Sequence, residues 1–375
     1  MKILYFDLNM PYLLKDACYP VGGATVQWYS WIKGFAANSC RVGVLTWTGA
    51  KAYVGYNDLV EIIECFDFDR YEGKIDWISK IIPALSSAIK RYGPDIVVQG
   101  VAGTVTGALA FVCKMLEIPF IYRVANDMEA DSRIKERLGL LQRTSFFFGL
   151  KCSNRIICQN SYQSQRLKKK FSPQKVAKIP NPFDISSVGS TPIMPHKRRR
   201  YIAWIGIFQH QKNLPALLQV VKELPQFEFR IAGQTSASLD IETKQALTAL
   251  ERLSNVKFVG YLKRSEIQEF LSHAYLLLNT SLYEGFSNTF LESLFAGTPV
   301  ITRKVVDPDN IISSNGLGRT VENYSEMSNS IKSLIKMKDR EYHLIARRCR
   351  EYIVLNHDPQ KLARCFLDVL SWDAT

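Results

Sequence analysis

The sequence has little of what marks a metal-binding, redox or disulfide-rich protein. Its eight cysteines form no C-x-x-C pair, and its five histidines are scattered without metal-ligand spacing. Structural zinc is therefore not expected, and the cysteines are predicted to be reduced thiols of a cytosolic protein. Internal repeats and low-complexity segments are also missing.

Long apolar runs are missing as well. The longest uncharged run, residues 96–112, contains three glycines and Gln99, and it falls short of the roughly 20 apolar residues that a membrane span needs. Asp7 and Asn9 interrupt the apolar N-terminal run, which predicts a buried strand and not a signal peptide. We expect a cytoplasmic protein, either soluble or peripheral on the inner face of the membrane.

Acidic residues are in the minority. Lys and Arg number 48 against 35 Asp and Glu, which gives a net charge of +13 and favours anionic partners. No nucleic-acid-binding motif accompanies this charge, so nucleic acid is not the expected partner. The basic runs 166–170 and 197–200 are either solvated faces or a docking site for anionic lipid headgroups. Three phenylalanines at 146–148 add an apolar patch on the acceptor side or in the core.

Short apolar runs alternate with segments of helical period, which predicts an α/β protein with parallel strands. Strands are expected at 2–6, 42–46, 96–99, 120–124, 155–159, 201–205, 227–232, 256–259, 275–279 and 299–302. Helices are expected near 24–37, 75–92, 104–117, 161–171, 213–223, 240–253, 264–273, 289–296 and 324–338. The segment 179–200 is rich in Pro, Ser and basic residues, and it is the best linker candidate. The 375 residues suit two domains, with boundaries predicted at 1–184 and 185–357.

The segment 281–302, SLYEGFSNTFLESLFAGTPVIT, says most about function. Two carboxylates, Glu284 and Glu292, bracket a turn and the start of a helix. The turn and first helical residues are Gly285, Phe286, Ser287, Asn288 and Thr289. A loop that runs into a helix presents backbone N–H groups and a positive dipole end, which suit a phosphate. The carboxylates can then accept hydrogen bonds from sugar or ribose hydroxyls on either side of it.

This segment and its surroundings resemble the donor domain of retaining GT-B glycosyltransferases of the family-four type. The matching pieces are 204–206 (WIG), 212–213 (KN), 230–233 (RIAG), 255–260 (NVKFVG), 22–24 (GGA), 94–98 (PDIVV) and 179–184 (IPNPFD). The resemblance implies the GT-B fold, two Rossmann-like domains with parallel sheets facing a central cleft. It also implies a C-terminal helix, around 358–372, that packs back on the first domain. The implied reaction moves a hexose from a UDP- or GDP-linked sugar to a saccharide or lipid-linked acceptor, with retention and without metal or other cofactor.

The resemblance also assigns roles to residues. Glu292 would bind the ribose hydroxyls of the donor, and Glu284 would lie near the transferred sugar and the leaving diphosphate. Lys212, six residues after Gly206, would neutralise that diphosphate. Amides of residues 286–289 would meet the phosphate oxygens. The glycines Gly22 and Gly23, which follow the first strand, would let the backbone approach the donor phosphate or the acceptor.

The chain departs from the family at two places. The arginine usual after the glycine is Ile207 here, and Gln209 or His210 is left as a replacement donor. The histidine usual before an aspartate is Asn126, followed by Asp127. Asn126 remains a candidate for hydrogen bonding to a sugar hydroxyl, while Asp127 or Arg123 would orient the acceptor. These departures keep open a transfer-inactive nucleotide-sugar-binding protein, and an epimerase that needs no acceptor is a third possibility.

Overall fold

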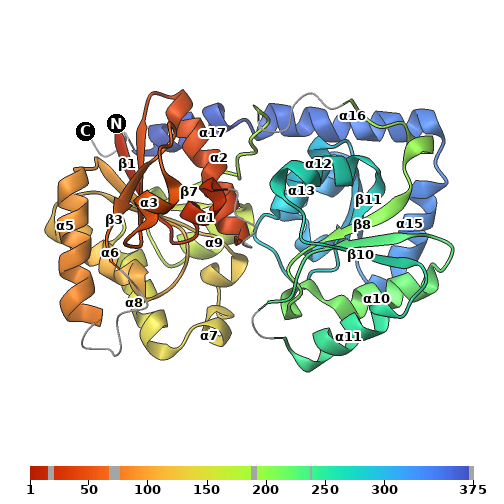
Figure 1. Ribbon diagram of the computed structural model, residues 1–375, viewed down its shortest axis with the longest axis horizontal. Helices are drawn as coiled ribbons and strands as arrows, with labels where there is room; N and C mark the ends of the chain where they lie inside the picture. Colours follow the sequence, from red (N-terminus) through yellow and green to blue (C-terminus); the bar gives the residue numbers. More distant parts are fainter. Residues whose placement is uncertain (16–20, 67–76, 187–191, 237–238, 371–375) are drawn as a thin grey trace. The chain divides into compact units, whose positions relative to one another are not determined.

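The computed structural model describes residues 1–15, 21–66, 77–186, 192–236 and 239–370. The chain divides into two compact units (Figure 1). Unit 1 comprises Met1–Pro182 together with Asp358–Thr375, and unit 2 comprises Phe183–His357. The chain thus changes units two residues before the boundary expected at 184/185.

The described residues of unit 1 form a seven-stranded parallel sheet in the order β3-β2-β1-β4-β5-β6-β7. The strands are β1 (Lys2–Phe6), β2 (Arg41–Thr46), β3 (Glu61–Glu64), β4 (Ile96–Gln99), β5 (Phe120–Arg123), β6 (Arg155–Cys158) and β7 (Val176–Lys178). The five strands expected from the sequence are all present. The short edge strands β3 and β7 were not expected, because β3 has a glutamate at each end and β7 is only three residues long and ends in a lysine.

Helices flank this sheet in unit 1. They are α1 (Met10–Leu14), α2 (Gly23–Ala37), α3 (Ala50–Val54), α5 (Ile82–Tyr92), α6 (Thr104–Met115), α7 (Ile134–Arg137), α8 (Leu140–Cys152), α9 (Ser161–Lys168) and α17 (Pro359–Leu370). A π-helical turn, η2 (Trp77–Ile81), leads into α5. The start of the helix expected at 75–92 and the end of the one at 358–372 lie outside the described residues. The sequence analysis did not predict α8.

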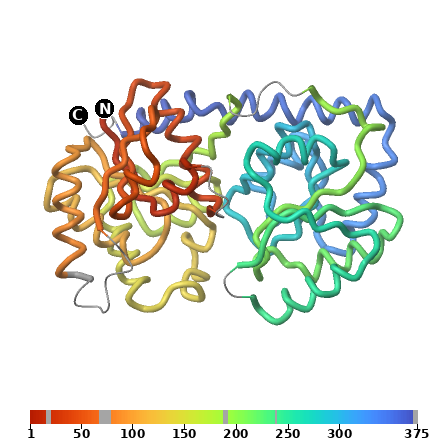
Figure 2. Tube along the Cα trace, in the orientation of Figure 1, coloured from red at the N-terminus to blue at the C-terminus, as the bar shows by residue number. Residues whose placement is uncertain are grey.

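The C-terminal helix α17 packs on α2, and the tube in Figure 2 shows the two segments side by side. The ring of Phe366 is fully buried and meets Trp31 and Phe35 with centroids 5.4 and 5.3 Å apart. Gly34 permits this close approach, because a Cβ there would lie 2.2 Å from the carbonyl oxygen of Pro359. The end of the chain is therefore part of the core of unit 1.

The described residues of unit 2 form a six-stranded parallel sheet in the order β10-β9-β8-β11-β12-β13. The strands are β8 (Tyr201–Ile205), β9 (Phe229–Ala232), β10 (Val256–Gly260), β11 (Ala274–Leu278), β12 (Val300–Arg303) and β13 (Gly318–Val321). Two parallel-sheet α/β units confirm the predicted fold class. In each sheet the strand order reverses at the first strand, between β1 and β4 and between β8 and β11. Ligands of such sheets bind beyond the carboxyl ends of the strands at that point.

The helices of unit 2 are α10 (Leu214–Glu223), α11 (Ile241–Glu251), α12 (Arg264–Ser272), α13 (Asn288–Phe295), α14 (Ile311–Ser314), α15 (Met327–Ile335) and α16 (Asp339–Asn356). The 18-residue α16 was not expected, since most of its sequence is polar. It buries a narrow stripe at Tyr342, Ala346, Cys349 and Ile353, spaced by four, three and four residues as one helical face requires.

The basic run at 197–200 is not a uniform surface patch. Lys197, Arg198 and Arg200 are exposed, but Arg199 is 1% exposed. Its guanidinium donates to the carbonyl oxygens of Ala274 (2.6 Å) and Gly297 (2.8 Å) and to Thr298 Oγ1 (2.6 Å). Arg199 is therefore excluded from the lipid docking that the sequence left open for this run.

Candidate functional site

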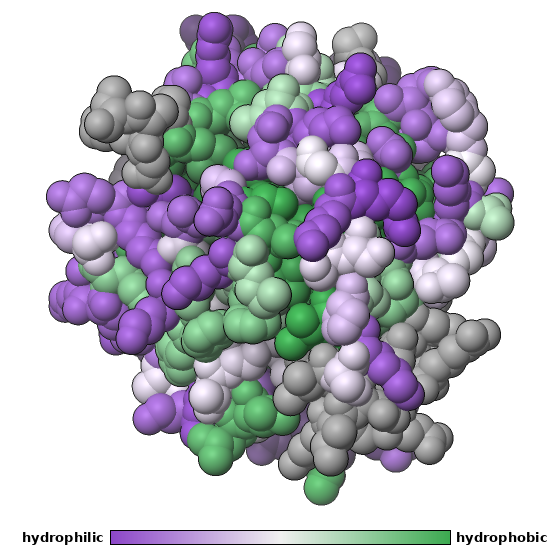
Figure 3. Space-filling model, turned by 90° about the vertical axis from the view of Figure 1, so that its left-hand side faces the viewer, coloured by the Kyte–Doolittle hydropathy of each residue, from purple (hydrophilic) through white to green (hydrophobic). Residues whose placement is uncertain are grey.

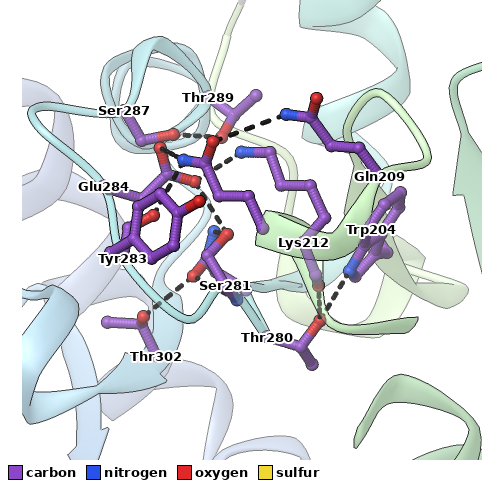
Figure 4. A network of polar contacts seen from close by, with 12 residues as sticks. Trp204, Gln209, Lys212, Thr280, Ser281, Tyr283, Glu284, Ser287, Thr289 and Thr302 are labelled. Carbon is purple, nitrogen blue, oxygen red and sulfur yellow. Dashed lines mark hydrogen bonds and ion pairs between the residues drawn. The ribbon is translucent and has the colours of Figure 1, made fainter. Parts of the chain in front are cut away.

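The candidate donor residues of unit 2 gather where the chain leaves β8 and β11, at the reversal of strand order. The loop after β8 carries Gly206, Gln209 and Lys212, and the loop after β11 carries Glu284 and leads into α13. Figure 4 shows polar side chains from both loops pointing toward one another. The parallel arrangement thus brings together two segments that are about seventy residues apart in the sequence.

A glycine next to this loop makes its path possible. Gly233, directly after β9, has φ +147°, and a Cβ there would lie 1.9 Å from the carbonyl oxygen of Gly206. Gly206 in turn faces the side chain of Lys212, since a Cβ on Gly206 would lie 3.4 Å from Lys212 Cδ. The absence of side chains at 206 and 233 therefore leaves room for the lysine.

Local hydrogen bonds fix the backbone of Lys212. The residue ends a short 3-10 helix, and Asn213 then adopts a left-handed conformation (φ 49°, ψ 62°) and caps α10. Asparagine tolerates this conformation better than most residues. Thr280 Oγ1 donates to the Lys212 carbonyl oxygen over 2.8 Å and accepts from Trp204 Nε1 over 3.1 Å.

Lys212 and Glu284 form an ion pair between Nζ and Oε1 (Figure 4). Their side chains are only 14% and 10% exposed. Glu284 also accepts from Ser281 Oγ at Oε1 (2.7 Å) and from Gln211 Nε2 at Oε2 (3.4 Å). The carboxylate is thus held by three side-chain donors. Two of them were not predicted: Ser281 is the first residue of the segment 281–302 but was given no role, and Gln211 lies just before the matching pair at 212–213.

The helix α13 begins beside this pair without a side-chain cap. Ser287 stands at the N-cap position, but its hydroxyl pairs with Thr289 Oγ1 over 2.8 Å (Figure 4). Gly285 and Phe286 are buried, and the Phe286 ring belongs to the core of unit 2, whereas Asn288 and Thr289 are half-buried. The positive end of the α13 dipole therefore points to the side of the Lys212–Glu284 pair, as an anion site requires.

Glu292 lies in the second turn of α13 and is half-buried. Burial raises the pKa of its carboxyl group to about 7, and the positive charge of Arg264 opposes that rise. The Glu292 carbonyl oxygen accepts from Gln268 Nε2 over 3.0 Å. A carboxyl group that titrates near neutral pH is poised to respond to a ligand that donates hydrogen bonds.

The two candidates for replacing the missing arginine take different positions. Gln209 Nε2 donates to Gln211 Oε1 over 3.4 Å, so Gln209 belongs to the network around Glu284. His210 is exposed and belongs, among the described residues, to a cluster with Asp240 and Glu242 whose ligand atoms lie within 4.8 Å of one another. That cluster has the groups to hold a metal ion. However, Asp240 already caps α11 by accepting from the backbone N–H and hydroxyl of Thr243 (2.8 and 2.7 Å).

The predicted site residues of unit 1 lie at the carboxyl edge of its own sheet. Gly22 is the N-cap of α2 and Gly23 its first residue. Nothing lies within 4 Å of a Cβ built on Gly22, so packing does not require glycine there. Thr25 Oγ1 of α2 donates over 3.2 Å to Asp7, which follows β1 and whose pKa burial raises to about 6.

Asn126 and Asp127 are engaged in local structure after β5. Asn126 Oδ1 accepts from the Met128 backbone N–H over 3.0 Å and so caps a short 3-10 helix. Asp127 Oδ1 accepts from Asn160 Nδ2 and Gln163 Nε2, each over 2.9 Å. Burial raises the pKa of Asp127 to about 6, although both hydrogen bonds lower it.

Arg123 is enclosed behind these residues, with 1% of its surface exposed. Its guanidinium bonds Gln27 Oε1 and Asn181 Oδ1 and lies over the Trp31 ring at 5.4 Å. Burial lowers the pKa of Arg123 to about 9. The expectation that Arg123 orients an acceptor is therefore not supported, because the side chain connects α2 to the 179–184 segment inside unit 1.

Comparisons with known proteins agree with this architecture. The structure of sucrose-phosphate synthase from Thermosynechococcus elongatus matches with a TM-score of 0.77 and 15% identity, over 100% of both chains. The family model "Glycosyl transferases group 1" matches residues 193–352, and "Glycosyltransferase Family 4" matches residues 21–187. The chain belongs to the GT-B glycosyltransferases. The group 1 match covers the Lys212–Glu284 pair and Glu292, which places them in the glycosyltransferase domain of unit 2.

Two curated relatives illustrate the range of this glycosyltransferase family. The gpi3 subunit of phosphatidylinositol N-acetylglucosaminyltransferase from Schizosaccharomyces pombe is 22% identical over 51% of this chain and 44% of its own length. The UDP-Gal:alpha-D-GlcNAc-diphosphoundecaprenol alpha-1,3-galactosyltransferase of Escherichia coli is 21% identical over 73% of this chain and 74% of its own. The chain thus spans less than half the length of the first of these relatives.

Proposed function

We propose that this glycosyltransferase moves a hexose from a UDP- or GDP-linked sugar to a hydroxyl of a saccharide or lipid-linked saccharide, with retention of configuration and without a metal ion. The observation that carries the proposal is the Lys212–Glu284 pair beside the uncapped start of α13, with Glu292 further along the same helix. The galactosyltransferase relative, which by its name uses UDP-Gal and a diphosphoundecaprenol acceptor, supports this class of substrates. We place the reaction in the synthesis of cell-surface polysaccharide, at the cytoplasmic face of the membrane.

Each group has a role that follows from its chemistry. Lys212 and the α13 dipole stabilise the negative charge that grows on the diphosphate as the bond from the anomeric carbon to the phosphate oxygen breaks. Glu284, fixed by Ser281 and Gln211, accepts from hydroxyls of the transferred sugar. The acceptor oxygen bonds to the anomeric carbon on the face that the diphosphate leaves, and the acceptor proton passes to the departing phosphate oxygen.

Turnover of purified protein against a panel of nucleotide sugars, in the presence of a chelator, tests the proposal. Glu292→Ala removes an acceptor for two ribose hydroxyls, and hydrogen bonds to a charged group are worth roughly 1.5–3 kcal/mol, so donor affinity should fall about 10- to 100-fold. Glu251→Ala, which changes an exposed carboxylate on α11, should leave affinity unchanged. Turnover that Glu292→Ala does not affect contradicts the assignment. Donor binding without transfer to any acceptor would instead identify a nucleotide-sugar-binding protein.

The pH dependence of donor binding follows from the raised pKa of Glu292, about 7. The ionised carboxylate accepts hydrogen bonds from both ribose hydroxyls, whereas the protonated carboxyl group is a weaker acceptor. Affinity should therefore be high above pH 7 and fall by about tenfold as the pH drops one unit below the pKa. Calorimetry with an intact nucleotide sugar is the measurement, because its phosphates carry no group that titrates in this range. Glu292→Gln should give a flat profile, and an unchanged slope in that variant would assign the titration to another group.

A further inference from the structure

The positive charge of this chain is concentrated in one stretch of unit 1. Between Glu136 and Asp184 the sequence contains no Asp or Glu, but it has ten Lys or Arg, at 137, 143, 151, 155, 166, 168, 169, 170, 175 and 178. The whole chain carries a net charge of +13, so this stretch supplies most of it. Such an excess over 47 residues is a localised feature and not a general property of the surface.

Within this stretch, α8 presents large apolar side chains to solvent. Leu140, Leu141 and Phe148 are 72%, 56% and 43% exposed, while Phe146 and Leu150 on the other side of the helix are fully buried. Leu141, Thr144 and Phe148 are spaced by three and four residues and so share one face. The phenylalanine run at 146–148 is thereby divided between core and surface. Figure 3, which views the molecule from the left-hand side of Figure 1, shows apolar side chains reaching the surface among hydrophilic ones.

The neighbouring helix α6 also carries exposed apolar side chains. Ser145 Oγ of α8 donates to the Thr104 carbonyl oxygen of α6 over 2.7 Å, so the two helices lie against each other. Phe111 and Met115 of α6 are 40% and 61% exposed.

Cations from a later segment border α8. Lys175 Nζ donates to the Lys151 carbonyl oxygen at the end of α8 over 2.8 Å, and Lys170 Nζ lies 5.9 Å from the centre of the Phe147 ring. Lys168, Lys169 and Lys170 are all exposed. Ammonium groups thus border the second half of α8, at Phe147 and at Lys151, and residues 137–183 include no carboxylate.

We propose that α8 and the segment 166–175 dock unit 1 on an anionic lipid bilayer, with Leu140, Leu141 and Phe148 entering between the headgroups. Apolar side chains surrounded by lysines suit the boundary between acyl chains and anionic headgroups. A purely polyanionic partner such as nucleic acid would use the cations but not the exposed leucines. Among the described helices none combines the length and the apolar character to cross a bilayer, so this attachment is of the peripheral kind.

The inference deepens the proposed function and rests on it only for the acceptor. The start of α8 lies on the side of the unit 1 sheet at which parallel strands end, the side that also carries Asp7, Asn126 and Asp127. Docking there would present this edge to an acceptor whose lipid is embedded in the bilayer.

Sedimentation with vesicles tests the surface without donor or acceptor, so failure of the transfer assay would leave its result unaffected. The full chain should bind vesicles that contain phosphatidylglycerol, bind neutral phosphatidylcholine vesicles weakly, and release from the former at high salt. Replacing Lys168, Lys169 and Lys170 by glutamine should lower the affinity on the order of a hundredfold, since each cation near the surface contributes about a factor of five. A second variant, which combines Leu140→Ser, Leu141→Ser and Phe148→Ser, should also weaken vesicle binding at least tenfold.

Matched controls on unit 2 decide whether the site is local. One control variant changes Lys197, Arg198 and Arg200 to glutamine and removes the same charge. The other combines Leu344→Ser with Leu355→Ser and removes exposed apolar side chains of α16. Both controls should bind vesicles like the unaltered protein, with thermal unfolding used to verify that every variant is folded. If the variant at 197, 198 and 200 loses as much vesicle affinity as the variant at 168–170, the proposal is overturned, because binding then depends on the net charge of the whole chain. Full binding by the serine variant of α8, or binding to DNA but not to anionic vesicles, would also overturn it.

Discussion

Replacing Lys212 by alanine should lower kcat for sugar transfer by about 10²- to 10³-fold, the range typical for loss of one group that stabilises transition-state charge. The lysine is 14% exposed and paired with Glu284, so its loss leaves a poorly solvated carboxylate facing the incoming diphosphate. Ile207 stands where the related enzymes usually have an arginine. Compensation of the diphosphate charge therefore depends more heavily on Lys212 in this protein.

Steady-state kinetics measures the change in kcat, and ligand titrations show which part of the donor Lys212 contacts. Lys212→Ala should weaken binding of the nucleoside diphosphate but not of the bare nucleoside, because in the proposed donor site the lysine contacts phosphate and not base or ribose. Lys222→Ala removes an exposed lysine from the last turn of α10 and should behave like the unaltered protein. A Lys212→Ala enzyme with normal kcat, or with equal losses for nucleoside and diphosphate, would remove Lys212 from the phosphate site.

The pairing of Lys212 with Glu284 also suggests a double substitution. Glu284→Gln keeps the hydrogen bonds to Ser281 and Gln211 possible but removes the charge. If the two residues act as one ion pair during transfer, the effects of Lys212→Ala and Glu284→Gln on kcat should be strongly non-additive. Additive effects would indicate that the ion pair of the ligand-free protein is lost when the donor binds.

The central strands of the fold could be predicted from the sequence, whereas of the four edge strands only β10 was predicted. The strands β4 and β8 have the predicted bounds, because each is a short buried run set off by turn-forming or basic residues. By contrast, β3, β7 and β13 lie at sheet edges and carry charged or polar residues. The helices α8 and α16 were missed for different reasons. The helix α8 is apolar on both sides, whereas α16 is mostly polar and carries exposed Leu344 and Leu355 outside its buried stripe.

The candidate site shows the same division between local and long-range information. The segment around Glu284 and Glu292 pointed to a phosphate and hydroxyl site from its own residues. Two of the three partners that hold Glu284, Gln211 and Lys212, come from a loop about seventy residues earlier, and no spacing in the sequence indicates that contact. Similarly, the sequence does not distinguish the buried Arg123 and Arg199 from exposed basic residues, because burial depends on which strands lie beside each other.

Replacing Arg199 by methionine should destabilise the protein by about 3–5 kcal/mol, the cost expected when a buried hydrogen-bonded charge network loses its central member. Methionine fills a similar volume, so the loss comes from the acceptors. The carbonyl oxygens of Ala274 and Gly297 and the hydroxyl of Thr298 lose a donor in a region that water does not reach. Each buried group left without a partner costs about 1–3 kcal/mol.

Arg200→Met provides the matched control, because Arg200 is the exposed neighbour in the same basic run. Its free energy of unfolding in urea should stay within about 0.5 kcal/mol of the unaltered protein. Arg199→Lys should give an intermediate loss of stability. The lysine ammonium group retains the charge but lacks the planar guanidinium fork with which arginine reaches all three acceptors. Equal stability of Arg199→Met and Arg200→Met would mean that water replaces the guanidinium group. The first strand of unit 2 would then be less tightly joined to the turn after α13 than these hydrogen bonds indicate.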